Sequence, residues 1–352
     1  MNTTMTRVLM GLLLLSPLAE ACTVPVFRYA LDRWHADAYR FEVAAGWMES
    51  AQAAKLRTLL GETATELEVV ALAKGDSPAR LLMPTEEEAV VWSGQPDAEL
   101  SALFLSPMRE KIAQELLSGA SMVWVMVSSG SAEKDQEFEK RISERLSYLE
   151  SVAAIPEQDP NDPESKLGPG PDLRVGFSFL KVARSDAKEE VFLKMLVGPA
   201  GAPLLEGDEP FAGVVFGRGR ALGVWPSSEL DEEGIDEVSL FLLGACSCRV
   251  KIGNPGWDIA MAIDWDTRLM ASQMAADRKF EDSVLPVSLS EERAGQGAPI
   301  ALLPEVVSFE GGADLVVPGK GNKGSVLGIV LGSLAVVAGL VALYFMVSIK
   351  GS

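Results

Sequence analysis

MVWVMVSSGSAEKDQEFEKRISERLSYLES, residues 122–151, is the stretch that sets the fold class of this 352-residue chain. Six apolar residues in a row, Met122–Val127, predict a strand that is buried on both faces. A long helix is expected over Ser131–Ser151, with apolar residues at helical spacing at Phe138, Ile142, Leu146 and Leu149. A fully buried strand followed at once by a helix is typical of α/β packing.

The residues that follow continue the alternation of strand and helix. We expect a strand over Leu173–Val182, a helix over Ala187–Val197, and a hairpin from Val214 to Trp225 around Gly217-Arg218-Gly219-Arg220. A last helix is expected over Leu230–Leu243. This order resembles that of a thioredoxin-like domain, with Pro210 where that fold places a proline before its hairpin. The resemblance is one of topology, and topology alone supplies no function.

The residues before the opening stretch include the start of the same domain and a separate N-terminal domain. Ser106-Pro107 is an N-cap followed by proline at the first helical position, so a helix begins there. Residues 22–105 are expected to form an N-terminal α/β domain, a candidate degenerate thioredoxin-like copy, and residues 106–265 the thioredoxin-like domain. The elements expected in the first are helices over 27–34 and 50–60 and strands over 40–46, 67–73 and 89–92.

The N-terminus reads as a cleaved signal peptide over residues 1–21. Arg7 supplies the positive charge, Val8–Leu15 the apolar run, and Ala19-Glu20-Ala21 the cleavage site. Cleavage there would make Cys22 the first mature residue. Acylation of Cys22 is the alternative, although the small-residue cleavage pattern is the better match.

The C-terminus reads as one transmembrane helix over residues 324–349. The run Ser325–Ile349 carries no charge and is long enough to cross a hydrocarbon core of about 30 Å. Residues 266–323 would form an extension and stalk, and residues 350–352 a cytoplasmic tail. Gly324, Gly328 and Gly332 share one helix face, which suits a homodimer or a membrane-protein partner, although glycine is also common in membrane helices.

Composition excludes several function classes. A formal net charge of −19 disfavours binding to nucleic acid phosphates. The single histidine, His35, has no nucleophile motif near it, so no catalytic triad is supported. We expect no cofactor and no resident metal.

The stretch Gly244–Trp265, GACSCRVKIGNPGWDIAMAIDW, concentrates the unusual residues of the chain. With Cys22, its Cys246 and Cys248 make up all three cysteines. Outside the cytoplasm they are not expected to remain free thiols together. A bond from Cys22 to either of the others would stabilise the fold by about 5 kcal/mol in the chain-entropy model. A strained Cys246–Cys248 bond, a zinc site with His35, and a copper(I) site remain alternatives.

A redox enzyme would use the same cysteines. In the second domain the position of a reactive pair is Ser128-Ser129-Gly130-Ser131, which holds no cysteine, so that domain is expected to be redox-inactive. Cys22-Thr23-Val24-Pro25 resembles a Cys-x-x-Cys motif with its second cysteine replaced. A structural role for Cys22 is favoured over a reactive one.

Other residues of note receive structural interpretations first. Arg218 and Arg220 are a weak candidate anion site, but in so acidic a chain pairing with its own acids is favoured. Trp257 and Trp265 are expected in the core. Asp258 and Asp264 are expected in solvent or hydrogen-bonded near the Asn254-Pro255-Gly256 turn.

Three blocks together resemble a family of uncharacterised exported bacterial proteins. They are CTVPVFRYALDRW from Cys22, VFGRGRAL from Val215 and GACSCRVKIGNPGWD from Gly244. The family start has glutamate where this chain has Asp32. The resemblance runs from Cys22 to about Trp265 and implies export, but it brings no established activity.

We therefore expect a membrane-anchored, extracytoplasmic interaction or accessory protein, with its body on the periplasmic side. The alternative is a thiol–disulfide oxidoreductase or metal-handling protein that uses Cys22, Cys246 and Cys248. Whether the chain is an enzyme is left open, with a non-enzymatic role favoured.

Overall fold

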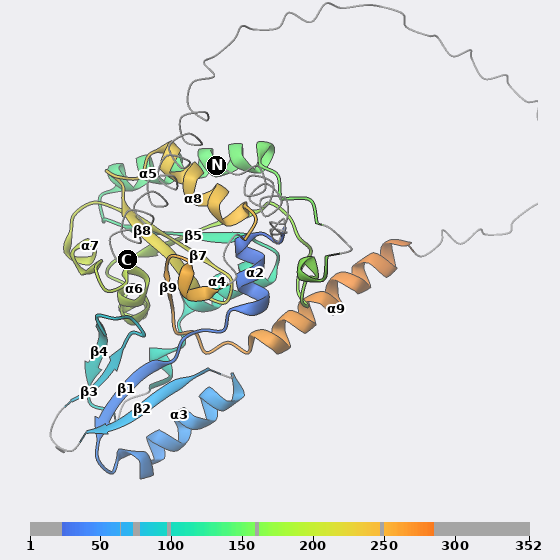
Figure 1. The fold of residues 1–352 in the computed structure, drawn as a ribbon. Helices are drawn as coiled ribbons and strands as arrows, with labels where there is room; N and C mark the ends of the chain where they lie inside the picture. The colour runs from blue at the N-terminus through green and yellow to red at the C-terminus, as the bar shows by residue number, and fades with distance from the viewer. Residues whose placement is uncertain are drawn as a thin grey trace, which may run out of the picture. The chain divides into compact units, whose positions relative to one another are not determined.

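Two mixed sheets carry the fold (Figure 1). The computed structural model describes residues 23–63, 65–72, 78–96, 100–158, 162–246 and 250–284, and only the backbone of residues 164 and 275–284. All of these residues belong to one compact unit, Met1–Val287. The expected signal peptide and transmembrane helix lie outside the described residues. Within the described part, no helix is both long and apolar enough to span a bilayer.

The smaller sheet is four-stranded, with the order β2-β1-β3-β4. Its strands are β1 (Tyr39–Ala44), β2 (Leu67–Leu72), β3 (Ala79–Leu82) and β4 (Val90–Gly94). Strands β1 and β2 are parallel and are joined through α3 (Ala51–Glu62), whereas β3 is antiparallel to both β1 and β4. Helix α3 begins where expected because the Ser50 side chain accepts a hydrogen bond from the backbone N–H of Ala53.

The larger sheet is five-stranded, with the order β6-β5-β7-β8-β9. Its strands are β5 (Met122–Ser128), β6 (Phe177–Ala183), β7 (Phe211–Phe216), β8 (Arg220–Pro226) and β9 (Trp257–Asp258). Strands β5 and β6 are parallel and the remaining neighbours are antiparallel. Strand β5 lies between β6 and β7, and its six apolar residues are all buried, as their uninterrupted run predicts.

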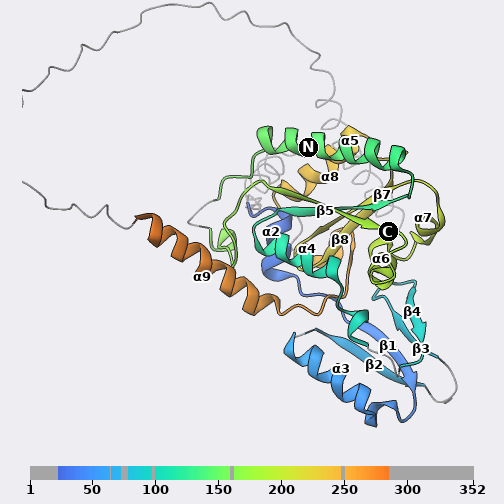
Figure 2. The ribbon, with the colours of Figure 1, turned by 180° about the vertical axis from the view of Figure 1, so that it is seen from behind.

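Helices cover both faces of the larger sheet (Figure 2). One face packs against α5 (Ala132–Val152), α8 (Glu232–Leu243) and α2 (Val26–Arg33), in a core that includes Trp124. The other packs against α4 (Pro107–Leu117) and α6 (Glu190–Val197), in a core that includes Val125 and continues to Phe41 of the smaller sheet. The two sheets therefore share a hydrophobic core.

Several boundaries differ from the sequence expectations. Strand β6 begins at Phe177 because the Arg174 guanidinium donates to the carbonyls of Ser118 and Gly119, which holds the preceding residues against the turn after α4. The first part of the expected C-terminal extension forms helix α9 (Trp265–Val284). The elements not expected are β3, β9, α7 (Ala202–Glu206) and the 3-10 turns η1 (Trp47–Glu49), η2 (Leu100–Leu103), η3 (Pro163–Ser165) and η4 (Lys251–Gly253).

Candidate functional site

The structure brings together the described parts of all three sequence blocks. The backbone N–H of Val26 donates to the carbonyl of Gly244 at 3.0 Å, and that of Cys246 donates to the carbonyl of Val24 at 2.9 Å. From the hairpin turn, Arg218 Nε donates to the carbonyl of Leu31 at 2.8 Å. Helix α2 thus lies on the larger sheet, beside α8, although smaller-sheet strands follow it in sequence (Figure 1).

Of the three cysteines, Cys246 lies within the described residues. Cys246 is buried and pairs through its backbone with Val24. Cys22 and Cys248 lie outside the described residues, as do Gly324, Gly328 and Gly332 of the expected membrane helix. The described backbone therefore brings the residues just after Cys22 beside Cys246.

Arg220 and Asp258 form a buried ion pair at the centre of the three blocks. Arg220 Nη1 lies 3.0 Å from Asp258 Oδ1, and both side chains are buried. The guanidinium also donates to the carbonyls of the Asn254-Pro255-Gly256 turn, the closest being that of Gly256 at 2.7 Å, and lies 5.8 Å from the Trp34 ring centroid. These additional hydrogen bonds help to offset the free-energy cost of removing the two charges from water.

Asp258 collects further partners from two other segments. The backbone N–H of Asp37 donates to its Oδ2 at 2.7 Å, and the Tyr39 hydroxyl donates to its backbone carbonyl at 2.8 Å. Lys251 also pairs with Asp258 and donates to the carbonyl of His35 at 2.6 Å. Asp258 is hydrogen-bonded as expected but lies in the interior, not near solvent.

Arg218 is bound in the same region and pairs with a different acid. Its Nη2 lies 2.8 Å from Asp266 Oδ1 at the start of α9. The flanking glycines permit this close approach, because both have positive φ and a Cβ at Gly217 would lie 2.7 Å from that of Ala30. Arg218 and Arg220 each pair with an acid of the chain, so an anion would have to displace those acids.

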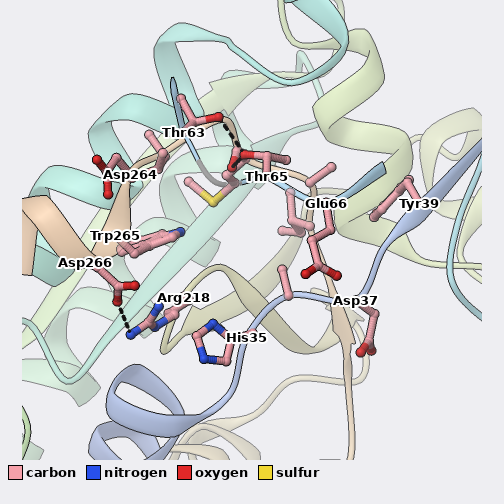
Figure 3. Close-up of a pocket in the computed structure, with 15 residues that line it drawn as sticks. His35, Asp37, Tyr39, Thr63, Thr65, Glu66, Arg218, Asp264, Trp265 and Asp266 are labelled. Carbon is pink, nitrogen blue, oxygen red and sulfur yellow. Dashed lines mark hydrogen bonds and ion pairs between the residues drawn. The ribbon is translucent and has the colours of Figure 1, made fainter. Parts of the chain in front are cut away.

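A pocket of about 80 Å³, lined by both polar and apolar residues, opens beside this network. It is lined by the link from α2 to β1, the end of α3, the hairpin turn and the residues that lead into α9. Figure 3 shows the polar side chains around it, which are His35, Asp37, Tyr39, Thr63, Thr65, Glu66, Arg218, Asp264 and Asp266. Its volume suits a few water molecules or one small polar group.

The polar groups of the pocket are largely committed to the fold. The hydroxyls of Thr63 and Thr65 lie 2.8 Å apart, and each also bonds to a backbone carbonyl. Asp264 accepts from the backbone N–H of Thr267 at 3.1 Å, and the hydrogen bonds from Thr267 lower the pKa of that carboxyl. Across the described part of the chain, no three His, Cys, Asp or Glu side chains are placed to hold a metal ion.

The loop between β5 and α5 is closed by an acid of the helix. Asp135 accepts hydrogen bonds from the backbone N–H and hydroxyl of Ser129, at 2.7 and 2.8 Å, and from the backbone N–H of Gly130. Asp135 therefore ties the loop that leads into α5 to the first turn of the helix.

Among the buried charged groups that were not anticipated from sequence are Arg28 and Arg109. Arg28 donates to Asp32 and to the carbonyls of Gly168 and Pro171, so α2 holds the loop that crosses it. Burial raises the pKa of the Asp32 carboxyl, although the positive charge of Arg28 opposes this. Arg109 lies in the shared core, where burial lowers its pKa to about 10. The RYALDR run signalled only a helix, because Arg28 and Asp32 are an ordinary i,i+4 pair in sequence.

No protein-family model matches the chain, and no curated protein or solved structure is significantly similar to it.

Proposed function

We propose that this chain is a membrane-anchored, extracytoplasmic interaction protein whose residues 106–265 form a redox-inactive thioredoxin-like domain. The sheet order β6-β5-β7-β8, with β5 and β6 parallel and α5 and α8 on one face, supports the thioredoxin-like assignment. The smaller sheet has the equivalent order β2-β1-β3-β4, which supports a degenerate copy before it. The sequence patterns at the two ends supply the export signal and the anchor.

The observation that carries the redox-inactive assignment is the β5–α5 loop. A thioredoxin-like oxidoreductase needs a thiolate at this helix start, where the positive end of the helix dipole lowers the thiol pKa. Here the loop holds Ser128, Ser129 and Ser131, and Asp135 occupies the N–H groups of Ser129 and Gly130. The loop therefore holds no thiol for disulfide exchange.

One observation favours the alternative, a thiol–disulfide or metal-handling protein. The hydrogen bonds between residues 24–26 and 244–246 place Val24, which follows Cys22 by two residues, beside Cys246. A group of three cysteines assembled there would serve equally as a structural disulfide or as reactive thiols.

Counting thiols separates the two functions. The purified mature chain is titrated native and denatured, and any disulfide is mapped by mass spectrometry. The interaction function predicts one free thiol, and a bond from Cys22 to Cys246 or Cys248 that glutathione does not reduce. Thiols that react rapidly at neutral pH, or that bind one equivalent of zinc or copper(I), would establish the alternative instead.

A further inference from the structure

Four large apolar side chains are exposed at the C-terminal ends of two neighbouring helices. Tyr148 and Val152 of α5 are 50% and 56% exposed, and Leu240 and Phe241 of α8 are 48% and 40% exposed. We call these four residues the α5–α8 face. Single exposed apolar residues are ordinary, whereas several gathered together mark interaction sites.

The packing of the two helices brings these residues together. Arg145 of α5 pairs with Asp236 of α8, Nε to Oδ1 at 2.6 Å, so the helices lie side by side at this level. Both run in the same direction, because Arg141, one turn earlier on α5, donates to the carbonyl of Leu230, before α8 begins. Tyr148 follows Arg145 by three residues and Leu240 follows Asp236 by four, so they flank this ion pair on adjoining helices.

The surroundings of the α5–α8 face are acidic. Glu233 and Glu237 of α8 are exposed and lie within two turns of its apolar residues. Glu144 of α5 is also exposed, and its carboxylate lies 3.9 Å from the Lys140 ammonium. The nearby cation Arg145 is occupied, because it binds Asp236 and Glu232 and lies over the Tyr148 ring at 4.6 Å. Even with Glu144 beside Lys140 and Arg145 bound to Asp236 and Glu232, acids outnumber cations here, so the rim of the apolar centre carries net negative charge.

We propose that the α5–α8 face docks a basic amphipathic helix of a partner protein. An apolar stripe would cover the four side chains, and Lys or Arg residues beside it would meet the glutamates. A second copy of this chain would set acids against acids, and an anionic lipid surface would be repelled likewise. The proposal rests on the proposed interaction function and names the chemistry of its partner.

The test measures binding of a designed probe to the full mature chain in phosphatidylcholine nanodiscs. The probe is a fluorescent 18-residue peptide of leucine and lysine arranged as an amphipathic helix. Its binding is measured by fluorescence anisotropy at physiological salt. A peptide of the same composition, scrambled to remove the apolar stripe, reports charge attraction alone. We expect the scrambled peptide to bind at least about tenfold more weakly, since tenfold corresponds to about 1.4 kcal/mol.

Variants locate the bound peptide. The double variant Val152→Ser/Leu240→Ser should weaken binding at least about tenfold, because exposed positions leave the fold intact while the apolar centre is lost. Glu233→Gln/Glu237→Gln should weaken binding and flatten its salt dependence. Ile252→Ser and Glu86→Gln, at exposed sites away from both helices, are the matched controls and should bind as the parent does.

Three results would overturn the proposal: equal binding of both peptides, equal loss in the control variants, or self-association that Leu240→Ser abolishes. None of these involves a cysteine. A failed docking test therefore leaves the thiol count intact, and a reactive-thiol result would reject the interaction function whatever the peptide does.

Discussion

Replacing Arg220 with methionine tests whether the buried ion pair holds the three sequence blocks together. The change keeps much of the apolar stem but removes the charge that faces Asp258 and the donors to the Asn254-Pro255-Gly256 turn. Asp258 would remain buried with Lys251 as its remaining cation. Breaking a buried pair from one side costs about 3–5 kcal/mol. Here Asp258 loses its most buried partner, and three carbonyls of the turn lose their donor.

For a body of this size, about 1 kcal/mol lowers the melting temperature by about 2–4 °C, so Arg220→Met should lower it by roughly 6–20 °C. Urea unfolding followed by tryptophan fluorescence measures the free energy directly, and Trp34 lies against the guanidinium. Arg218→Met is the matched control, two residues away. Arg218 is itself only 10% exposed and donates to the Leu31 carbonyl, but its partner Asp266 is 61% exposed and would be solvated when left alone. The control should therefore cost only about 1–2 kcal/mol.

Equal losses for the two variants would refute the reasoning. A second measurement guards against an effect of methionine itself. The double variant Arg220→Met/Asp258→Leu removes both charges, and its loss should be smaller than the sum of the single losses by about 1–3 kcal/mol. Strict additivity would mean that the two groups do not interact as described.

Three further predictions follow. Gly217→Ala should destabilise the fold more than Gly130→Ala, measured by urea unfolding, because both have positive φ but only Gly217 faces a neighbouring backbone. Asp264→Asn should lower the unfolding free energy at pH 6, and the difference from the parent should shrink as the pH falls below 3.8: the pKa of Asp264 is below that usual value in the fold, so its contribution is lost as pH falls through the lowered pKa. Arg28→Met should speed limited proteolysis within residues 156–171, since Arg28 binds that loop; unchanged cleavage would contradict this contact.

The elements with strong local signals could be predicted from sequence. The uninterrupted run Met122–Val127, the stripe of α5 and the Ser106-Pro107 start of α4 each specify their element within a few residues. Strand β3 could not be predicted in this way, because its ARLL sequence is short and its stability comes from pairing with β1 and β4. Two-residue β9 has even less local signal.

The candidate site was predicted only in its parts. Sequence identified the three blocks, but not that Arg220 of one pairs with Asp258 of another, because long-range ion pairs leave no periodic trace. It placed Asp258 beside a turn, where aspartate is usual, and had no means to show that this side chain is buried against Arg220. The docking of α2 on the larger sheet is hidden for the same reason: its partners lie about two hundred residues later.

The pairing of Val26 with Gly244 also determines when α2 can dock during synthesis of the chain. Helix α2 is among the first described elements to be synthesised, yet its backbone partners follow about two hundred residues later. At about 5–20 residues per second, its apolar face waits about 10–40 s for the larger sheet and α8. During that interval Val26, Phe27 and Tyr29, all buried in the finished fold, have no native surface to cover them. A newly made chain is therefore most exposed to aggregation at its N-terminal end, where a holding chaperone would be of greatest benefit.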